Sequence, residues 1–341
     1  MTQSMPTQVT VGVDTHADVH VAVAKDRFGR RLDTTSVATT PAGYAQLLGW
    51  AQRLGQVDAW GIEGTGSFGA GLTRFLRHRG QLVVEVNRPD RHARRRRGKS
   101  DPLDAEAAAR AVQAREGSVP KAGDGQVEMI RSLRVARATA MKARTQAINA
   151  LKALVATAPE ELREQLRGLS TVSLVQAAAA VGPGAVTTPM AAAKLALRAL
   201  ACRYQALSVE ITTLDVELDR LTAAVAPKLV ALFGVGPDSA GALLVAAGGN
   251  PDRLRSEAAF SMLCGASPIE ASSGKTRRHR LNRGGDRQAN AALHRIVVAR
   301  LRHDRRTQDY VARRLSQGKS RKEAIRCLKR YLVREVFRTL P

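Results

Sequence analysis

Residues 9 to about 115 alternate between short β-branched runs and longer amphipathic segments, and this alternation restricts the fold more than any other feature of the chain. The pattern predicts strands over residues 9–14, 19–25, 31–37, 57–62 and 82–86, and helices over residues 41–54, 67–79 and 101–115. Strands with short connections favour antiparallel pairing, whereas strands separated by a helix favour parallel pairing. We therefore expect a mixed sheet covered by helices.

In this order of elements the first strand lies at the centre of the sheet, next to the strand that follows the first helix. That is the ribonuclease H-like arrangement.

Residues 127–225 are instead rich in Ala, Leu, Arg, Glu and Gln, a composition typical of long helices. Apolar residues recur there at steps of three and four in two stripes, which predict a coiled coil, either antiparallel or intermolecular. The first stripe holds Ile130, Leu133, Ala136, Ala140, Ala143, Ala147, Leu151 and Leu154, and the second holds Leu207, Ile211, Leu214, Leu218 and Leu221.

The expected fold class is therefore α/β plus α, in three parts. Residues 7–120 form a ribonuclease H-like domain, residues 126–226 form a long helical coiled-coil connector, and residues 227–341 form a basic C-terminal domain. This last domain is helical in pattern after residue 289, while residues 272–287 have the composition of a loop.

The charge of the chain points to a nucleic-acid partner. The sequence has 54 Lys and Arg against 30 Asp and Glu, a net charge of +24, and residues 251–341 alone hold 23 basic against 8 acidic residues. Such an excess is the electrostatic footprint of nucleic-acid binding. A merely soluble basic protein is the alternative. Binding to a membrane surface is not indicated, because the sequence shows no basic amphipathic helix beside a large apolar face. A basic run before the helix expected over residues 101–115 is predicted to contact phosphate, through Arg94, Arg95, Arg96, Arg97 and Lys99.

The three cysteines, Cys202, Cys264 and Cys327, lie far apart without the spacing of a zinc site or of a disulfide framework. The N-terminus lacks the pattern of a signal peptide, and no stretch has the apolar length needed to span a bilayer. These features predict a cytoplasmic protein.

Two acids follow apolar strands. Asp14 ends the run VTVGVD, and Glu63 ends the run of residues 57–62 with glycines on both sides. An Asp in such a place is more often a turn former than a catalyst. In the expected sheet, however, the two strands are neighbours, so we expect both carboxylates at one end of the sheet.

Asp101 and Asp104 stand three residues apart in KSDPLD, which places them on one face of the expected helix. Helix capping, with Pro at the first helical position, explains this pair about as well as a functional site does. Four carboxylates in one pocket would repel one another unless a divalent cation neutralised them. Oxygen ligands select hard ions such as Mg²⁺ or Mn²⁺, which serve phosphoryl transfer.

Three motifs, VGVDTH, GIEGTGS and KSDPLDAEAAARAV, resemble the Asp, Glu, Asp and Asp motifs of the DEDD transposases of bacterial insertion sequences. The stretch LCGASPIEASSGKTRRHRLNRGGDRQANAALHRI is similar to the second signature of that family. The resemblance implies a recombinase that excises and inserts its own element by strand exchange, guided by a structured bridge RNA. It makes Asp14, Glu63, Asp101 and Asp104 the catalytic and metal-binding acids.

The resemblance further implies a serine nucleophile in the C-terminal domain that becomes transiently linked to DNA. Ser273 matches the family motif best, and its neighbour Ser272 stays open as the alternative. Basic residues around the serine would hold the scissile phosphate and its flanks, namely Lys275, Arg277, Arg278, Arg280, Arg283 and Arg287.

The expected partners are DNA, a guide RNA and further copies of the chain, as a dimer or a tetramer, because the acids and the serine come from distant parts of the sequence. Two other functions fit the same residues. One is a metal-dependent, structure-selective nuclease that cuts branched DNA without a covalent intermediate, and the other is a non-enzymatic binder with a decayed acidic fold.

Overall fold

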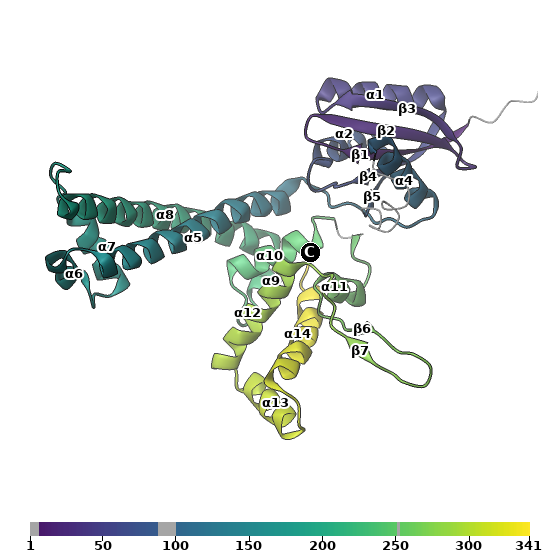
Figure 1. Cartoon of the computed structure of the whole chain (residues 1–341). Coiled ribbons are helices and arrows are strands. Elements are labelled where there is room, and N and C mark those ends of the chain that lie inside the picture. The colour runs from purple at the N-terminus through teal and green to yellow at the C-terminus, as the bar shows by residue number, and fades with distance from the viewer. Residues whose placement is uncertain (1–6, 88–99, 251–252) are drawn as a thin grey trace, which may run out of the picture. The chain divides into compact units, whose positions relative to one another are not determined.

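The computed structural model of the protein describes residues 7–87, 100–250 and 253–341, and the chain divides into two compact units (Figure 1). The first unit comprises Met1–Gly125 and Ala247–Ser256, and the second comprises Gln126–Ala246 and Glu257–Pro341. The three-part division expected from the sequence, with a boundary near residue 227, stays a prediction.

The first unit contains five strands and three helices among its described residues: β1 (Gln8–Thr15), β2 (Val19–Asp26), β3 (Arg31–Ala38), α1 (Pro41–Leu54), β4 (Gln56–Glu63), α2 (Ala70–Arg77), β5 (Val83–Val86) and α4 (Asp101–Gln113). The strands form one sheet in the order β3-β2-β1-β4-β5. β1 pairs antiparallel with β2 and parallel with β4, as the element order predicts. This mixed sheet fits a ribonuclease H-like α/β fold.

The element ends differ from the sequence prediction where glycines or turns intervene. The helix expected over residues 67–79 begins only at Ala70, because Gly64 has a positive φ of 67° and its carbonyl oxygen accepts a hydrogen bond of 2.8 Å from the Ser67 N–H. This turn follows Glu63 directly and allows the chain to leave the sheet.

One face of the sheet packs against α1 and α2. Val9, Val11 and Val13 of β1 are fully buried there, together with apolar side chains of both helices, such as Leu47 and Leu72. Since side chains alternate along a strand, Gly12 and Asp14 face the opposite side of the sheet.

Helix α4 covers that opposite side at close range. Gly12 and Gly61 are register partners on β1 and β4, and both lie under α4. A Cβ atom at Gly12 would collide with the Ala105 carbonyl oxygen, and one at Gly61 would lie 2.6 Å from the Ala108 carbonyl oxygen. The two glycines therefore allow the helix backbone to approach the sheet.

The returning segment of the chain, residues 247–256, is fixed to the first unit by side-chain hydrogen bonds. The Asn250 amide donates to the Pro120 carbonyl oxygen at 3.2 Å and accepts from the Ala122 N–H at 3.1 Å. Arg253 Nε donates to the Val119 carbonyl oxygen at 3.2 Å. A segment far along the sequence thus belongs to the first unit.

The second unit is helical apart from one short hairpin in its described residues. Its elements are α5 (Gly125–Thr157), α6 (Glu160–Leu166), α7 (Thr171–Ala180), α8 (Pro189–Val225), α9 (Pro227–Val230), α10 (Pro237–Ala247), α11 (Glu257–Leu263), β6 (Ile269–Glu270), β7 (His279–Arg280), α12 (Arg287–His303), α13 (Arg305–Ser316) and α14 (Arg321–Phe337). None of the described helices is both long enough and apolar enough to cross a membrane.

The long helices α5 and α8 lie side by side and run in opposite directions (Figure 1). Leu151, near the end of α5, shares a core with Leu197, near the start of α8, while Arg137 in the first half of α5 pairs with Asp215 in the second half of α8. Both helices correspond to the two apolar stripes of the sequence. That they form a coiled coil stays a prediction.

We predict that Gly12→Ala destabilises the protein by about 2–3 kcal/mol, because the added methyl group forces α4 away from the sheet. Gly49→Ala is the matched control: Gly49 lies within α1 and the nearest atom to its Cβ position is an Arg53 side-chain nitrogen at 3.7 Å. Alanine there should leave stability unchanged or raise it by up to about 1 kcal/mol. Thermal unfolding measures both variants, and equal melting temperatures would contradict the tight contact.

Candidate active site

Two strand ends and one helix start bring the acids of the first unit together. Asp14 lies at the end of β1, Glu63 ends β4, and both are on the face of the sheet that α4 covers. Asp101 begins α4, and Asp104 lies in its first turn. Because α4 crosses Gly12 through Ala105 and Ala109, its first turn extends to the strand ends that hold Asp14 and Glu63.

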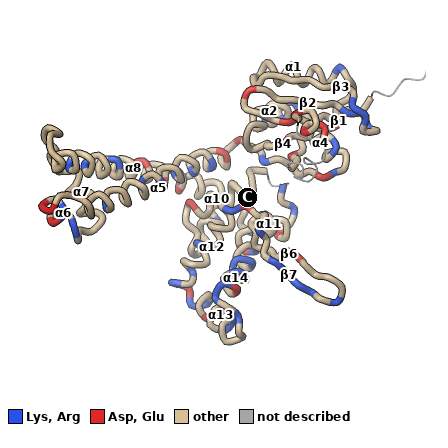
Figure 2. The backbone as a smooth tube through the Cα atoms, viewed as in Figure 1, with Lys and Arg blue, Asp and Glu red and all other residues tan. Residues whose placement is uncertain are grey.

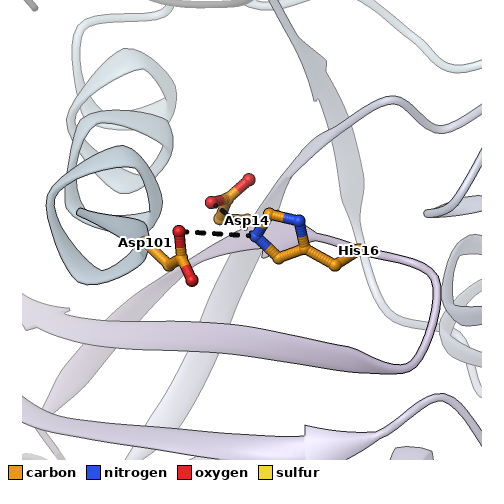
Figure 3. Close-up of side chains that lie close together, drawn as sticks. All are labelled: Asp14, His16 and Asp101. Atoms are coloured by element: carbon orange, nitrogen blue, oxygen red, sulfur yellow. Dashed lines mark ion pairs between the residues drawn. The ribbon is translucent and has the colours of Figure 1, made fainter. Parts of the chain in front are cut away.

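An imidazole lies between two of these acids (Figure 3). His16 Nε2 is 3.2 Å from Asp14 Oδ2 and 3.6 Å from Asp101 Oδ1. One ligand atom from each of the three side chains fits within a mutual distance of 4.8 Å, the spacing needed to hold a metal ion. His16 is the last residue of the motif VGVDTH, and the sequence alone assigned it no role. The DTH spacing, with two side chains on one end of a strand, is the signal that could have found it.

The acids differ in exposure. Asp14, Glu63 and Asp104 are buried, whereas the side chain of Asp101 is 48% exposed. Burial raises the pKa of Asp14, the neighbouring carboxylates of Glu63, Asp104 and Asp101 raise it further, and His16 opposes them. All four acids expected from the sequence are therefore close enough to interact through their charges.

Hydrogen bonds from two threonine hydroxyls hold the strand ends. Thr15 Oγ1 donates a 2.8 Å hydrogen bond to the Glu63 carbonyl oxygen and so ties β1 to β4 beside the acids. In the loop after β4, the Thr65 hydroxyl donates to Glu85 Oε1 on β5 at 2.8 Å. These bonds limit how far Asp14 and Glu63 can move apart.

The start of α4 argues against a simple capping role for its two acids. The N-cap residue is Ser100, and Asp101 occupies the first helical position with Pro102 after it. Asp101 thus does not take the N-cap position that the capping explanation requires. The positive end of the helix dipole still favours both carboxylates at this place.

An ionic cluster around the buried Glu106 ties the middle of α4 to the sheet. Glu106 accepts a 2.9 Å hydrogen bond from the buried Lys25 of β2, and it also pairs with Arg31 and Arg110. Burial alone would raise the pKa of Glu106, but hydrogen bonds from Arg31, Lys25 and Arg110 outweigh it and lower the pKa to about 2. Glu106 therefore stays ionised and ties α4 to β2 and β3, a role that the sequence did not reveal.

The donor set suits a divalent metal. Carboxylate oxygens of Asp14 and Asp101 with the nitrogen of His16 form a compact site, and Glu63 and Asp104 add negative charge beside it. The sequence predicted oxygen ligands alone. His16 adds an imidazole nitrogen to this set, a ligand that divalent transition-metal ions accept.

Ser273, the expected nucleophile, belongs to the second unit and lies at the tip of the β6–β7 hairpin. The backbone groups of Ser273 and Thr276 exchange two hydrogen bonds of 3.1 Å, and Gly274 between them has a φ of 55°. The Ser272 hydroxyl accepts a 3.2 Å hydrogen bond from the Arg278 N–H. Among the described residues, no hydrogen bond engages the Ser273 hydroxyl, which leaves it the more available of the two serines.

Basic residues, blue in Figure 2, follow the returning strand of this hairpin and the loop after it. All six expected phosphate-binding residues of this region are exposed: Lys275, Arg277, Arg278, Arg280, Arg283 and Arg287. The other expected set, Arg94, Arg95, Arg96, Arg97 and Lys99, lies outside the described residues.

We predict that Asp14→Asn stabilises the metal-free protein at neutral pH. A raised pKa means that ionising Asp14 costs folding free energy, and this cost grows as the pH rises above 3.8 through the raised pKa. The gain of the variant should therefore be present at neutral pH and vanish below pH 3.8. Mn²⁺ should raise the melting temperature of the unmodified protein only.

Asp58→Asn is the control, since Asp58 is an exposed carboxylate on β4. It should change neither the melting temperature nor the response to Mn²⁺. A response to Mn²⁺ that persists in Asp14→Asn would argue against Asp14 as a ligand.

Comparison with known families agrees with this arrangement. Residues 11–158 match the DEDD model of IS110 elements, described as Transposase, and residues 226–312 match the model described as Transposase IS116/IS110/IS902 family. The first match spans all four acids and the second spans Ser273, and together they cover about two thirds of the chain. Comparison with curated proteins gives no match. The chain therefore belongs to the IS110 family of DEDD transposases, which are DNA recombination enzymes.

Proposed function

We propose that this transposase excises and inserts an insertion sequence by strand exchange, through a composite site of the acid cluster and Ser273. The observation that carries the proposal is the convergence of Asp14, Glu63, Asp101 and Asp104 at the end of β1. Four neighbouring carboxylates repel one another, and a bound cation would relieve this repulsion. Such a cluster therefore indicates chemistry on an anionic substrate through a cation. The exposed Ser273 hydroxyl, on a basic hairpin, supplies a nucleophile that DNA can reach.

In the proposed step, the Ser273 oxygen attacks the phosphorus of a DNA phosphodiester. A bond forms between the serine oxygen and phosphorus while the bond to one deoxyribose oxygen breaks. The serine proton passes to a base of the acid cluster, and the leaving oxygen takes up a proton. Attack by a deoxyribose hydroxyl of another strand then releases the serine and completes the exchange.

The residues that would hold the metal are Asp14, Glu63, Asp101 and Asp104, with His16 as a further ligand. A bound Mg²⁺ or Mn²⁺ would supply the positive charge that neutralises the acids and stabilises the developing charge on oxygen. The role of the four acids is then to fix that charge, and the role of α4 is to keep them at the strand ends.

The basic residues fit the phosphates on either side of the cut. Lys275, Arg277 and Arg278 lie next to Ser273 on the hairpin, where they can hold the scissile strand. Arg280, Arg283, Arg287 and the basic run from Arg94 to Lys99 would extend this contact to flanking DNA or to a structured guide RNA. The excess of 15 positive charges in residues 251–341 supports binding of nucleic acid by this part of the chain.

A composite site also gives a reason for the chain to assemble as a dimer or tetramer. The proposed place of this assembly is the cytoplasm. The acids and Ser273 belong to different units, so either one chain or two chains can supply them. Val209 and Val216, seven residues apart on α8, are 67% and 62% exposed, and this apolar spacing suits contact between copies.

We predict that Ser273→Ala abolishes the covalent protein–DNA adduct, while Ser272→Ala retains it. The reaction would use DNA carrying the element ends, RNA copurified with the protein and Mn²⁺, and a denaturing gel would separate the adduct from free protein. Glu63→Gln should also abolish the adduct while the protein keeps its fold, as circular dichroism would show.

An adduct that survives in Ser273→Ala and disappears in Ser272→Ala would move the nucleophile by one residue. Cleavage of branched DNA without any adduct would instead favour the structure-selective nuclease. Absence of both cleavage and metal binding would favour a non-enzymatic binder.

A further inference from the structure

The second unit contains a cavity of about 850 Å³ at the base of the β6–β7 hairpin. Its walls come from the loop between α11 and β6, from β7 and the loop after it, from Asn290 of α12, from the end of α13 and the turn after it, and from α14. This volume lies within the range of ligand sites in proteins. None of its wall residues belongs to the acid cluster, and Ser273 is not part of the wall.

The cavity has an uncompensated positive charge. Seven Lys and Arg side chains line it against one acid, Glu323. The Glu323 carboxylate is engaged, because it accepts hydrogen bonds of 2.8 Å from both the N–H and the hydroxyl of Ser320. Glu257 of α11 pairs with Arg330 and lies 3.6 Å from Arg334. Arg326 and Lys329 have no ion pair within the described residues.

Lys329 is held in place rather than left mobile. Its Nζ donates to Asn290 Oδ1 at 2.8 Å, and Asn290 Nδ2 donates to the carbonyl oxygens of Cys264 at 2.8 Å and Gly265 at 3.2 Å. Burial lowers the pKa of Lys329, and Arg326 lowers it further. A half-buried ammonium whose fixed partner is neutral is a position that an anion would stabilise.

An aromatic surface adjoins these cations. Tyr331 lines the cavity with a side chain that is 49% exposed, and its ring packs edge-on against Tyr310 at 5.8 Å between centroids. The Arg334 guanidinium carbon lies 5.7 Å from the Tyr331 ring centroid. Leu281, also on the wall, is 50% exposed. An exposed aromatic ring beside a guanidinium group is the kind of surface on which proteins stack a nucleobase.

We propose that this cavity holds one unpaired nucleotide of a nucleic-acid strand, with its phosphate at Arg326 and Lys329 and its base against Tyr331. A free phosphate would occupy only a small part of the volume and would leave the ring and Leu281 without a function. A continuous duplex keeps its bases stacked inside the helix and could use only the cations. The proposal rests on the nucleic-acid binding within the proposed function, but not on the Ser273 chemistry.

The test compares the full-length protein with two variants, Arg326→Gln and Tyr331→Leu, and with Arg321→Gln as control. Arg326 and Arg321 are exposed residues of the same helix, but Arg321 does not line the cavity. Fluorescence anisotropy would measure the Kd for fluorescein-labelled single-stranded DNA, for single-stranded RNA of the same sequence and for the blunt DNA duplex. EDTA excludes metal-dependent cleavage, so the result is independent of catalysis.

We expect each cavity variant to weaken single-strand binding about tenfold and duplex binding much less, whereas Arg321→Gln should change both equally and slightly. The larger loss in the DNA or the RNA series identifies the strand. Tyr331→Leu with unchanged single-strand affinity, or with equal losses for single strand and duplex, would overturn the proposal. Since no strand transfer is measured, failure of the Ser273 proposal would leave this outcome unaffected.

A cross-linking experiment checks the position directly. Strands that carry 5-iodouracil, irradiated with the unmodified protein, should label the peptide that contains Tyr331 or the one that contains His279, which also lines the cavity. Labelling confined to peptides outside the cavity wall would contradict the proposal.

Discussion

The contact of α4 with the two central strands determines where the acids of this transposase lie. Gly12 and Gly61 leave room for the helix backbone over β1 and β4, and the small side chains of Ala105, Ala108 and Ala109 face them. Two residues beyond each glycine, the same strand face carries Asp14 or Glu63, and one turn before Ala105 the helix carries Asp101. The pleat of the sheet and the pitch of the helix thus bring the acids to one edge.

Two groups of charged side chains lie along α4, one around Glu106 and one around Asp14, and they have different electrostatic properties. Glu106 is surrounded by Lys25, Arg31 and Arg110, so its charge is compensated within the fold and its pKa is low. Asp14 lies near the start of the same helix, and its burial, together with the charges of Glu63, Asp104 and Asp101, raises its pKa against the effect of His16. The first cluster stabilises the protein, whereas the second stores repulsion that a cation would relieve. Such stored repulsion is a common property of catalytic sites.

In the second unit the proposed functional residues lie among positive charges, in contrast to the acids of the first unit. Its hairpin presents Ser273 among exposed cations, and the cavity at the hairpin base adds Lys329, Arg326 and Tyr331 in a fixed arrangement. The hairpin tip is stabilised by the Ser273–Thr276 backbone pair and a positive-φ glycine, whereas the cavity is lined by loop and hairpin residues together with residues of α12, α13 and α14. A nucleotide held at the hairpin base would position the strand that the tip contacts. Nucleic-acid enzymes need both functions, because positioning and reaction require different side chains.

The sequence by itself determined the strand and helix order, the central place of β1 and the family, because periodicity and ordered motifs are local properties of the chain. It also named Asp14, Glu63, Asp101 and Asp104 as one group. Only the tertiary structure brought His16 between Asp14 and Asp101, surrounded the buried Glu106 with Lys25, Arg31 and Arg110, and assembled a cavity from the loop after α11, the β6–β7 hairpin and α12 to α14. These features depend on side chains from separate elements meeting in space. No spacing along the sequence records such a meeting, since it is set by how helices pack on a sheet and on one another.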